Sequence, residues 1–445
     1  MDAFFHPRGI AILGASTDPA KLGYAVARNL LHSGYPGPVR LINPRGGQIF
    51  GQPLYPALDA APDPIDLVIV IVPAPAAPQA LRDVGQRGIR AAILTSGGFR
   101  ETGPEGAALE AQVRQVCAEY GIRLLGPNCI GLLDTHLPLD TTFLPPPQPA
   151  RGGIAFLSHS GAFCAAVIDW SRDQGFGFSR LVSLGNQADL TETDFLPAMA
   201  TDPHTRVVAL YLESIGHGRR FVKEARRLSR HKPIIALKVG RSTAGQKAAA
   251  SHTGALTSGD AAFDAAFAKA GVLRADTAET LFDWARALET CPLPAGNRIA
   301  VLTNAGGPGV IAADALEAHG LTLAALSPAT QSALARLLPP AASPHNPVDM
   351  LASATPAQYA NCLRLLLDDP GVDGALVIIP PSPVGPTEAI AEALTPHLTA
   401  SPKPVVIALM GAHLVQIAAQ VFHAARVPLY PFPERAASAL GALYR

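Results

Sequence analysis

The sequence GIAILGASTDPAKLGYAVARNLLHSG (residues 9–34) contains an apolar run, a turn of small residues and a helical pattern, in that order. Two later stretches repeat this arrangement: GGIAFLSHSGAFCAAVIDWSRDQG (residues 152–175) and NRIAVLTNAGGPGVIAADALEAHG (residues 297–320). Ile10, Ile154 and Ile299 are equivalent in the three copies, with spacings of 144 and 145 residues. A strand, a glycine turn and a helix open a doubly wound parallel sheet. The repeat therefore predicts an α/β protein built from three doubly wound parallel-sheet domains.

Two proline-rich segments separate the three copies. They read FLPPPQPAR (residues 143–151) and ETCPLPAGN (residues 289–297). Proline removes the backbone donor that a continuing helix or strand would need, so both segments are expected to be connections. The predicted domains are residues 1–142, 152–288 and 297–445.

Composition limits the classes of partner. The chain of 445 residues has 35 Lys plus Arg and 35 Asp plus Glu, so no net field attracts nucleic acid or an anionic membrane surface. The apolar runs are far shorter than the roughly 20 residues that cross a bilayer, and the N-terminus lacks the basic region of a secretory signal. The five cysteines do not have metal-ligand spacing. We therefore expect a cytoplasmic protein without a membrane, nucleic-acid or metal site.

The first third has the pattern of a nucleotide-like site. Its turn, Gly14-Ala15-Ser16, lacks the full GxGxxG spacing of dinucleotide-binding proteins. After the second predicted strand, Asn43 and Arg45 replace the acidic residue that binds the ribose of NAD. A basic group at this position suits a ribose phosphate, which leaves NADP or coenzyme A. Further residues follow the predicted strand ends or the turn and are expected to line the cleft: Lys21, Val72, Pro73, Ala74, Ser96, Gly97 and Asn128.

The middle third contains a histidine in an unusual setting. In residues 240–259, 15 of 20 residues are Gly, Ala, Ser or Thr, and the only aromatic ring is that of His252. Such a segment packs weakly and is expected to move, so His252 is a candidate for carrying a phosphoryl group between sites. Its ring needs a carboxylate on the other nitrogen, and Glu213 is the candidate because it ends an apolar predicted strand.

A phosphoryl group also needs backbone N–H groups, and two glycine turns before predicted helices provide them. The expected phosphate-binding residues are Ser158, Ser160, Gly161, Asn304, Gly306 and Gly307.

Together these motifs resemble the alpha subunit of ADP-forming (NDP-forming) acyl-CoA synthetases, in the succinyl-CoA synthetase superfamily. The likeness covers nearly the whole chain and rests on GASTDPAKLG, INPRGG, GPNCIGLLD, SHSGA, GNQADL, YLES, KVGRS, SHTGAL, TNAGGPGV and NPVDM. The resemblance implies a Rossmann-like domain that binds coenzyme A and two flavodoxin-like domains. One departure is His159, because family members usually have glutamine at this position.

The resemblance also implies the reaction acyl-CoA + ADP + phosphate ⇌ carboxylic acid + CoA + ATP, through an acyl phosphate and phosphorylated His252 supported by Glu213. No stretch resembles an ATP-grasp domain or a Walker A loop. We therefore expect a separate ATP-grasp beta subunit that binds ATP or ADP with Mg²⁺, a small carboxylic acid as substrate, and a hetero- or homo-oligomer. The alternatives are a non-catalytic CoA-binding module, which would not need His252, and an NADP-dependent oxidoreductase, for which no hydride-transfer residue is evident.

Overall fold

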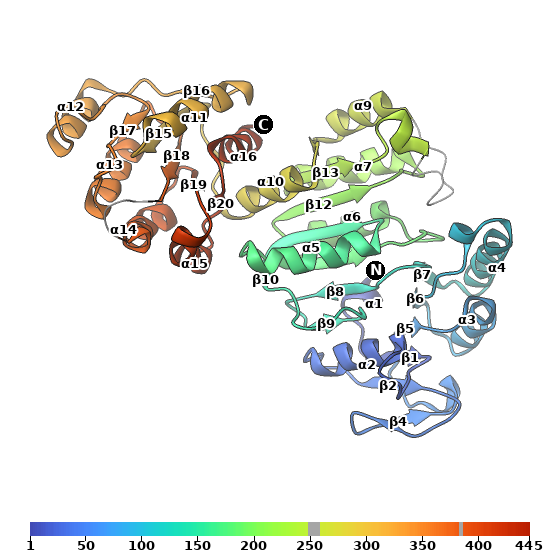
Figure 1. Ribbon diagram of the computed structural model, residues 1–445. Helices are drawn as coiled ribbons and strands as arrows, with labels where there is room; N and C mark the ends of the chain where they lie inside the picture. Colours follow the sequence, from blue (N-terminus) through green and yellow to red (C-terminus); the bar gives the residue numbers. More distant parts are fainter. Residues whose placement is uncertain (248–258, 382–385) are drawn as a thin grey trace. The chain divides into compact units, whose positions relative to one another are not determined.

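The structure is a computed structural model that describes residues 1–247, 259–381 and 386–445. Helices alternate with strands along the chain, and the strands form three largely parallel sheets (Figure 1). The predicted α/β class is therefore confirmed. The chain divides into two compact units: residues 1–173 with 177–275, and residues 174–176 with 276–445. In the described ranges, no helix has both the length and the apolar character needed to cross a membrane.

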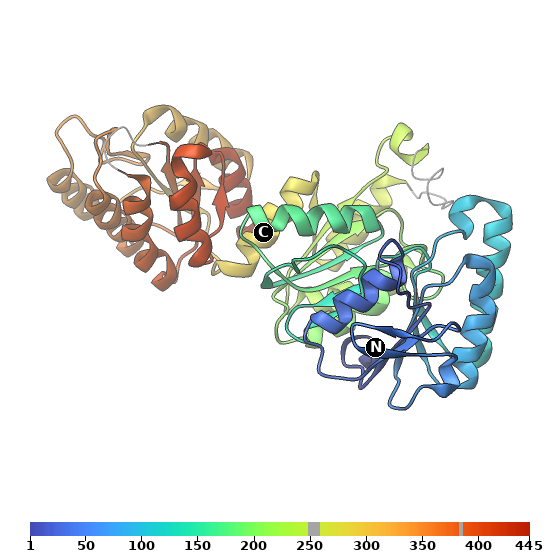
Figure 2. The same ribbon diagram turned by 60° about the horizontal axis from the view of Figure 1, so that its bottom comes forward.

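The first sheet has the strand order β3-β4-β2-β1-β5-β6-β7. Its strands are β1 (Ile10–Leu13), β2 (Val39–Ile42), β3 (Gln48–Ile49), β4 (Gln52–Tyr55), β5 (Leu67–Val70), β6 (Ala91–Leu94) and β7 (Arg123–Leu125). Strands β1, β5 and β6 are apolar throughout because both faces of the sheet are covered. Helix α2 (Leu22–His32) packs on one face, and α3 (Ala77–Gln86) and α4 (Pro104–Tyr120) pack on the other (Figures 1 and 2).

The second sheet has the order β14-β13-β12-β10-β11-β8-β9. Its strands are β8 (Leu132–Asp134), β9 (Leu139–Asp140), β10 (Arg151–Ser158), β11 (Phe178–Ser183), β12 (Val207–Leu212), β13 (Ile234–Lys238) and β14 (Val272–Ala275). Further helices of the first unit are α1 (Asp2–Phe5), α5 (Gly161–Asp173), α6 (Glu192–Thr201), α7 (Gly218–Ser229) and α9 (Asp260–Ala270). One core of buried apolar residues is shared by the first two sheets, which explains why they form one compact unit.

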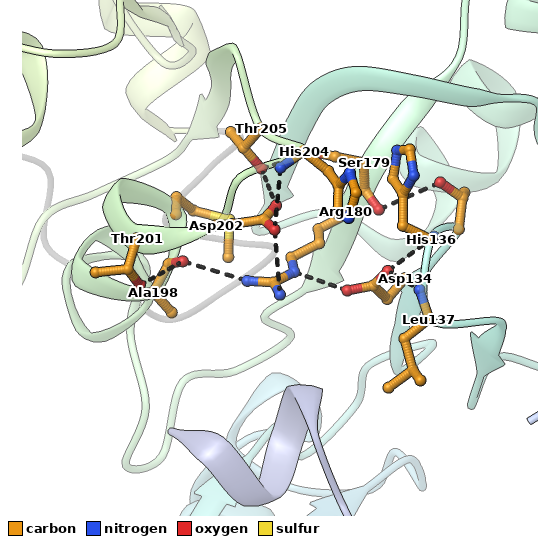
Figure 3. Close-up of polar contacts among 12 residues, drawn as sticks. Asp134, His136, Leu137, Ser179, Arg180, Ala198, Thr201, Asp202, His204 and Thr205 are labelled. Carbon is orange, nitrogen blue, oxygen red and sulfur yellow. Dashed lines mark hydrogen bonds and ion pairs between the residues drawn. The ribbon is translucent and has the colours of Figure 1, made fainter. Parts of the chain in front are cut away.

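Strands β8 and β9 precede the first proline-rich segment, yet they extend the second sheet: β8 pairs antiparallel with β11, and β9 pairs antiparallel with β8. A buried ion pair fixes this arrangement (Figure 3): Arg180 Nε of β11 donates to Asp134 Oδ2 of β8 at 2.8 Å. The same guanidinium lies 3.5 Å from Asp202 Oδ1 and donates to the carbonyl oxygen of Ala198. A buried charge is costly unless it is paired, so these contacts favour a single docking position for β8.

The third sheet, in the second unit, has the order β16-β15-β18-β19-β20, and β17 also pairs with β15. Its strands are β15 (Arg298–Thr303), β16 (Thr322–Leu323), β17 (Val348–Asp349), β18 (Gly374–Ile379), β19 (Val405–Leu409) and β20 (Leu429–Tyr430). The helices of this unit are α10 (Ala278–Thr290), α11 (Gly306–Ala318), α12 (Pro328–Leu337), α13 (Pro356–Asp368), α14 (Thr387–Ala400), α15 (Gln416–Ala424) and α16 (Pro433–Tyr444).

Helix α10 (Ala278–Thr290) begins ten residues before the predicted boundary at residue 288 and packs against α16 of the third-sheet unit. Trp284 Nε1 donates to Ser438 Oγ at 2.9 Å, and Arg435 forms a bidentate ion pair with the buried Asp283. The predicted domain boundaries stay a prediction, and these contacts show how α10 is held within the second unit.

Asp140 of β9 gives a prediction about pH. It is 4% exposed and accepts hydrogen bonds from the Thr142 N–H and from Gln148 Nε2. Burial raises the pKa of Asp140 from 3.8 to about 6, because the hydrogen bonds and the Arg28 charge only partly compensate. The folded chain therefore holds a proton between about pH 4 and 6 that the unfolded chain releases. The contribution of Asp140 to stability is largest below this window and falls as pH rises through it.

We expect Asp140→Asn to raise the free energy of unfolding at pH 7 by up to about 3 kcal/mol and to give no gain near pH 4. Thermal or urea unfolding at both pH values measures this difference. Asp169→Asn, at an exposed carboxylate of α5, is the matched control and is expected to change little. An equal gain at both pH values would contradict the raised pKa.

Candidate active site

The turn after β1 passes directly against the end of β5. Gly14 has a φ of +101°, and a Cβ on it would lie 2.1 Å from the carbonyl oxygen of Ile71. Only glycine fits both the backbone conformation and the space. The end of β2 is bonded to the same turn, since Asn43 Nδ2 donates to the carbonyl oxygen of Ala15 at 2.7 Å. Asn43 Oδ1 accepts from the Arg45 N–H. The side chain of Asn43 therefore binds both the turn after β1, through Ala15, and the turn after β2, through Arg45.

Arg45 and Lys21 are the exposed cations of this region. Among the described residues, neither side chain forms a hydrogen bond or an ion pair, so both are available to an anion. Lys21 precedes α2, which begins at Leu22. Helix α2 thus begins six residues beyond the turn Gly14-Ala15-Ser16, and Ser16 Oγ accepts from the Asp18 N–H of the intervening segment.

The carboxyl ends of the next strands bring further predicted residues together. Ser96 Oγ, after β6, donates to the carbonyl oxygen of Val72, after β5, at 2.5 Å. A Cβ on Gly97 would lie 3.2 Å from Asn128 Oδ1, so the Asn128 side chain lies beside the Ser96-Gly97 turn. Pro73 is exposed and Ala74 begins a short 3-10 helix. The predicted strand-end residues therefore form a continuous edge of the first sheet.

A carboxylate network that the sequence did not reveal borders this edge. Asn186, after β11, donates through Nδ2 to Glu101 Oε2 at 2.5 Å and to Glu110 Oε2 at 2.9 Å. Asn128 Nδ2 in turn lies 3.4 Å from Asn186 Oδ1. Burial alone would raise the pKa of Glu101, but hydrogen bonds from Asn186 and from the N–H groups of Phe99 and Gly98 lower it below its usual value. The network bonds the first-sheet edge to a loop of the second sheet.

The first predicted phosphate cradle lies between β10 and α5. Ser158 Oγ accepts from the Ser160 N–H and donates to the Ser160 carbonyl oxygen. Ser160 Oγ caps the helix by accepting from the Phe163 N–H at 3.2 Å. The first N–H groups of a helix have no intrahelical acceptor, and since Ser160 Oγ caps Phe163, the N–H groups of Gly161 and Ala162 are the ones available to an anion.

The second predicted cradle, between β15 and α11, repeats this construction in the other unit. Thr303 Oγ1 accepts from the Ala305 N–H and donates to the Ala305 carbonyl oxygen, as Ser158 does with Ser160. Asn304 is buried, and α11 starts at Gly306. A Cβ on Gly307 would meet open space, so this helix start is accessible.

Glu213 follows β12 and is 8% exposed. Its N–H donates to Nδ1 of His159 at 3.2 Å, and the His159 N–H donates to the carbonyl oxygen of Tyr211. The structure therefore bonds the backbone at Glu213 to the predicted cradle of residues 158–161. Burial raises the pKa of Tyr211, and the nearby charge of Glu213 adds to this effect.

Lys238 is a charged residue near Glu213 that the sequence analysis did not select. It ends β13 and pairs in register with Leu212, the residue before Glu213. Lys238 is 1% exposed, and its Nζ lies 4.6 Å from the centre of the Phe263 ring. Burial lowers the pKa of Lys238, while the charges of Asp260 and Glu213 oppose this shift. The signal that identified Glu213, a charge at the end of an apolar strand, applies equally to Lys238.

His252 lies outside the described residues, because residues 248–258 are not among them. Within the ranges that the structure describes, no group of three or more His, Cys, Asp or Glu residues is placed to hold a metal ion.

Three domain families match the chain in succession. A CoA binding domain matches residues 8–135, a succinyl-CoA ligase like flavodoxin domain matches residues 151–288, and a ligase-CoA domain matches residues 299–445. With the three sheets and the glycine turns, these matches define a CoA ligase of the succinyl-CoA ligase type.

Comparison with individual proteins narrows this class. The chain is 40% identical over 450 residues to the acetate–CoA ligase [ADP-forming] II subunit alpha of Pyrococcus furiosus, covering 100% of this chain and 97% of that one. It is 39% identical to the acetate–CoA ligase [ADP-forming] I of Archaeoglobus fulgidus, of which it spans 63%. A solved structure, the dinucleotide-forming acetyl-coenzyme A synthetase 1 of Ca. Korarchaeum cryptofilum in complex with phosphate and ADP, superposes with a TM-score of 0.94. That protein is 36% identical, and the match covers 99% of this chain and 96% of that chain. The chain belongs to the family of ADP-forming CoA ligase alpha subunits.

Proposed function

We propose that this chain is the alpha subunit of an enzyme that interconverts acyl-CoA + ADP + phosphate and carboxylic acid + CoA + ATP. The observation that carries the proposal is the hydrogen bond between the Glu213 N–H and His159 Nδ1, because it ties the backbone of the residue that carries the proposed supporting carboxylate to a phosphate cradle. In this proposal, CoA binds to residues 1–142. The phosphohistidine belongs to residues 152–288, and the second phosphate cradle belongs to residues 297–445.

The reaction proceeds in three transfers. Phosphate attacks the thioester carbon, the C–S bond breaks, and CoA leaves as a thiolate that takes up a proton. A ring nitrogen of His252 then attacks the phosphorus of the acyl phosphate, and the carboxylate leaves with the electron pair of the P–O bond. Finally an oxygen of ADP attacks the phosphohistidine, the N–P bond breaks and ATP forms.

The residues of this chain stabilise charge and orient the groups. The N–H groups at the starts of α5 and α11 bind the phosphoryl oxygens, and Glu213 accepts a hydrogen bond from the other ring nitrogen of His252. Relatives named as alpha subunits imply a partner subunit, and we assign the nucleotide and Mg²⁺ to a partner with an ATP-grasp fold.

The test measures ATP formation from acyl-CoA, ADP and phosphate by the purified chain, first alone and then with an ATP-grasp partner. A panel of carboxylic acids in the reverse direction identifies the acid. We expect negligible turnover by the chain alone and robust turnover with the partner. Robust turnover by the chain alone would show that no partner is needed. CoA binding without turnover, both for the chain alone and with the partner, would favour a non-catalytic CoA-binding module.

Arg45 gives a prediction about the CoA site. Its guanidinium is exposed beside a turn that Asn43 orders, which suits the 3′-phosphate of CoA. Arg45→Glu is expected to weaken CoA binding by about 1.5–3 kcal/mol, or roughly 10- to 100-fold, and to weaken 3′-dephospho-CoA much less. Calorimetry with both ligands measures the difference. The control is Arg114→Glu on the exposed side of α4, and equal weakening of both ligands would contradict the assignment.

A further inference from the structure

A buried pair of ionisable groups, His159 and Glu192, lies behind the α5 cradle. The side chains are 2% and 1% exposed, and His159 Nε2 lies 3.4 Å from Glu192 Oε2. Neither atom has a hydrogen-bond partner among the described residues, so the contact between them is an ion-pair contact at 3.4 Å. The second oxygen of Glu192, Oε1, accepts from Thr193 Oγ1 at 2.8 Å.

The hydrogen bond at the opposite side of the ring fixes the position of the proton. Nδ1 of His159 accepts from the Glu213 N–H, so this nitrogen holds a lone pair and no proton. A neutral imidazole then has its proton on Nε2, which faces the carboxylate of Glu192. Glu192 is the first residue of α6, where the helix N-terminus favours a negative charge. The His159 ring therefore bridges the start of α6 and the end of β12.

His159 is also part of the cradle itself, between Ser158 and Ser160. Its N–H donates to the carbonyl oxygen of Tyr211 and its ring accepts from the Glu213 N–H, each at 3.2 Å. Two bonds from one residue thus hold the cradle and the end of β12 at a fixed distance. We propose that His159, held by Glu192, is a positioning residue that sets Glu213 relative to the phosphate cradle.

The equivalent turn in the other unit shows that the cradle itself does not require a histidine. Asn304 occupies the position of His159, between Thr303 and Ala305, and the two turns have the same pair of hydroxyl hydrogen bonds. The backbone of such a turn therefore forms with an asparagine at its centre. What His159 adds is the reach of its ring from Glu192 to the backbone of Glu213.

This inference rests on the proposed function, because the position of Glu213 matters only if it supports a phosphohistidine. A misplaced carboxylate slows the transfers without changing how CoA binds, since the CoA site lies on the first sheet. Outer partners of a reacting group typically contribute about 10- to 100-fold to activity. The effect of losing His159 is therefore expected in kcat and not in the KM for CoA.

The experiment uses the chain in complex with its ATP-grasp partner and compares three variants. His159→Leu removes both ring nitrogens, His159→Gln keeps an acceptor for the Glu213 N–H and a donor for Glu192, and His231→Leu is a control at an exposed histidine. We measure kcat, the KM for CoA, the rate of phosphohistidine formation from ATP, and the unfolding temperature.

His159→Leu is expected to lower kcat and the phosphorylation rate by about 10- to 100-fold at unchanged KM, and His159→Gln to restore most of the loss. Unchanged kcat in a folded His159→Leu complex would overturn the positioning role alone. Equal losses in the Leu and Gln variants, together with a lower unfolding temperature and a higher KM, would show a merely structural role. A wild-type complex that forms no phosphohistidine would overturn the proposed function, and the positioning role with it.

Discussion

Replacing His252 by alanine is expected to abolish both turnover and phosphorylation of the chain. The proposed reaction passes the phosphoryl group through a ring nitrogen of this residue, and alanine has no atom that can take it. Acyl-CoA plus phosphate, or ATP plus the partner subunit, is expected to label the wild-type chain with an acid-labile, base-stable phosphoryl group. Labelling with radioactive phosphate, followed by peptide mapping, measures this difference.

CoA affinity provides the internal control for His252→Ala. The ring is not expected to contact CoA, so calorimetry is expected to give nearly the wild-type affinity. His217→Ala, at an exposed histidine before α7, is expected to keep both labelling and turnover. Near-normal turnover by His252→Ala with a competent partner would exclude the phosphohistidine mechanism, and the chain would then be interpreted as a CoA-binding module.

Glu213→Gln is expected to slow both phosphoryl transfers by about 100-fold or more while the fold is retained. The bond between this residue and His159 uses the backbone N–H of Glu213, so the substitution leaves it intact. The change removes only the negative charge that, in the proposed mechanism, orients the His252 imidazole and stabilises its cationic form. Rapid-quench measurements of phosphohistidine formation and decay determine the two rates.

The control for Glu213→Gln is Glu119→Gln, at an exposed position on α4. This variant also loses one carboxylate charge but is expected to react at the wild-type rate. If the two variants behaved alike, the carboxylate of Glu213 would have no role in the transfers. A loss of secondary structure in Glu213→Gln alone would instead indicate that burial of this charge organises the strand end.

The repeat in the sequence was sufficient to predict the three sheets. Ile10, Ile154 and Ile299 all lie in interior strands, each followed by a glycine turn and a helix. Apolar runs, glycine turns and proline breaks act over a few neighbouring residues, so they can be interpreted without knowledge of the fold. The same local logic selected Glu213, because a carboxylate at the end of an apolar strand lies at the edge of the sheet.

The sequence interpretation of Asn43 was incomplete. Asn43 was selected with Arg45 as a group facing a ribose phosphate, but both amide atoms of Asn43 bind within the chain, to Ala15 and to the Arg45 backbone. Of these two side chains, only that of Arg45 forms no hydrogen bond or ion pair within the described residues. A polar residue after a strand end has the same sequence signature whether it binds a ligand or orders a turn, so the residue type does not separate the two roles.

The sequence by itself determined the α/β class, the three strand, turn and helix units and the candidate residues at strand ends. Only the tertiary structure decided that β8 joins the second sheet through Arg180, that Asn186 bonds to two carboxylates, and that His159 bridges Glu192 and Glu213. The reason is that periodicity and turn chemistry depend on nearby residues, whereas these contacts join positions up to 85 residues apart. These charged and polar pairs form only where two surfaces of the protein are buried against each other, and which surfaces are buried is determined only when the sheets pack.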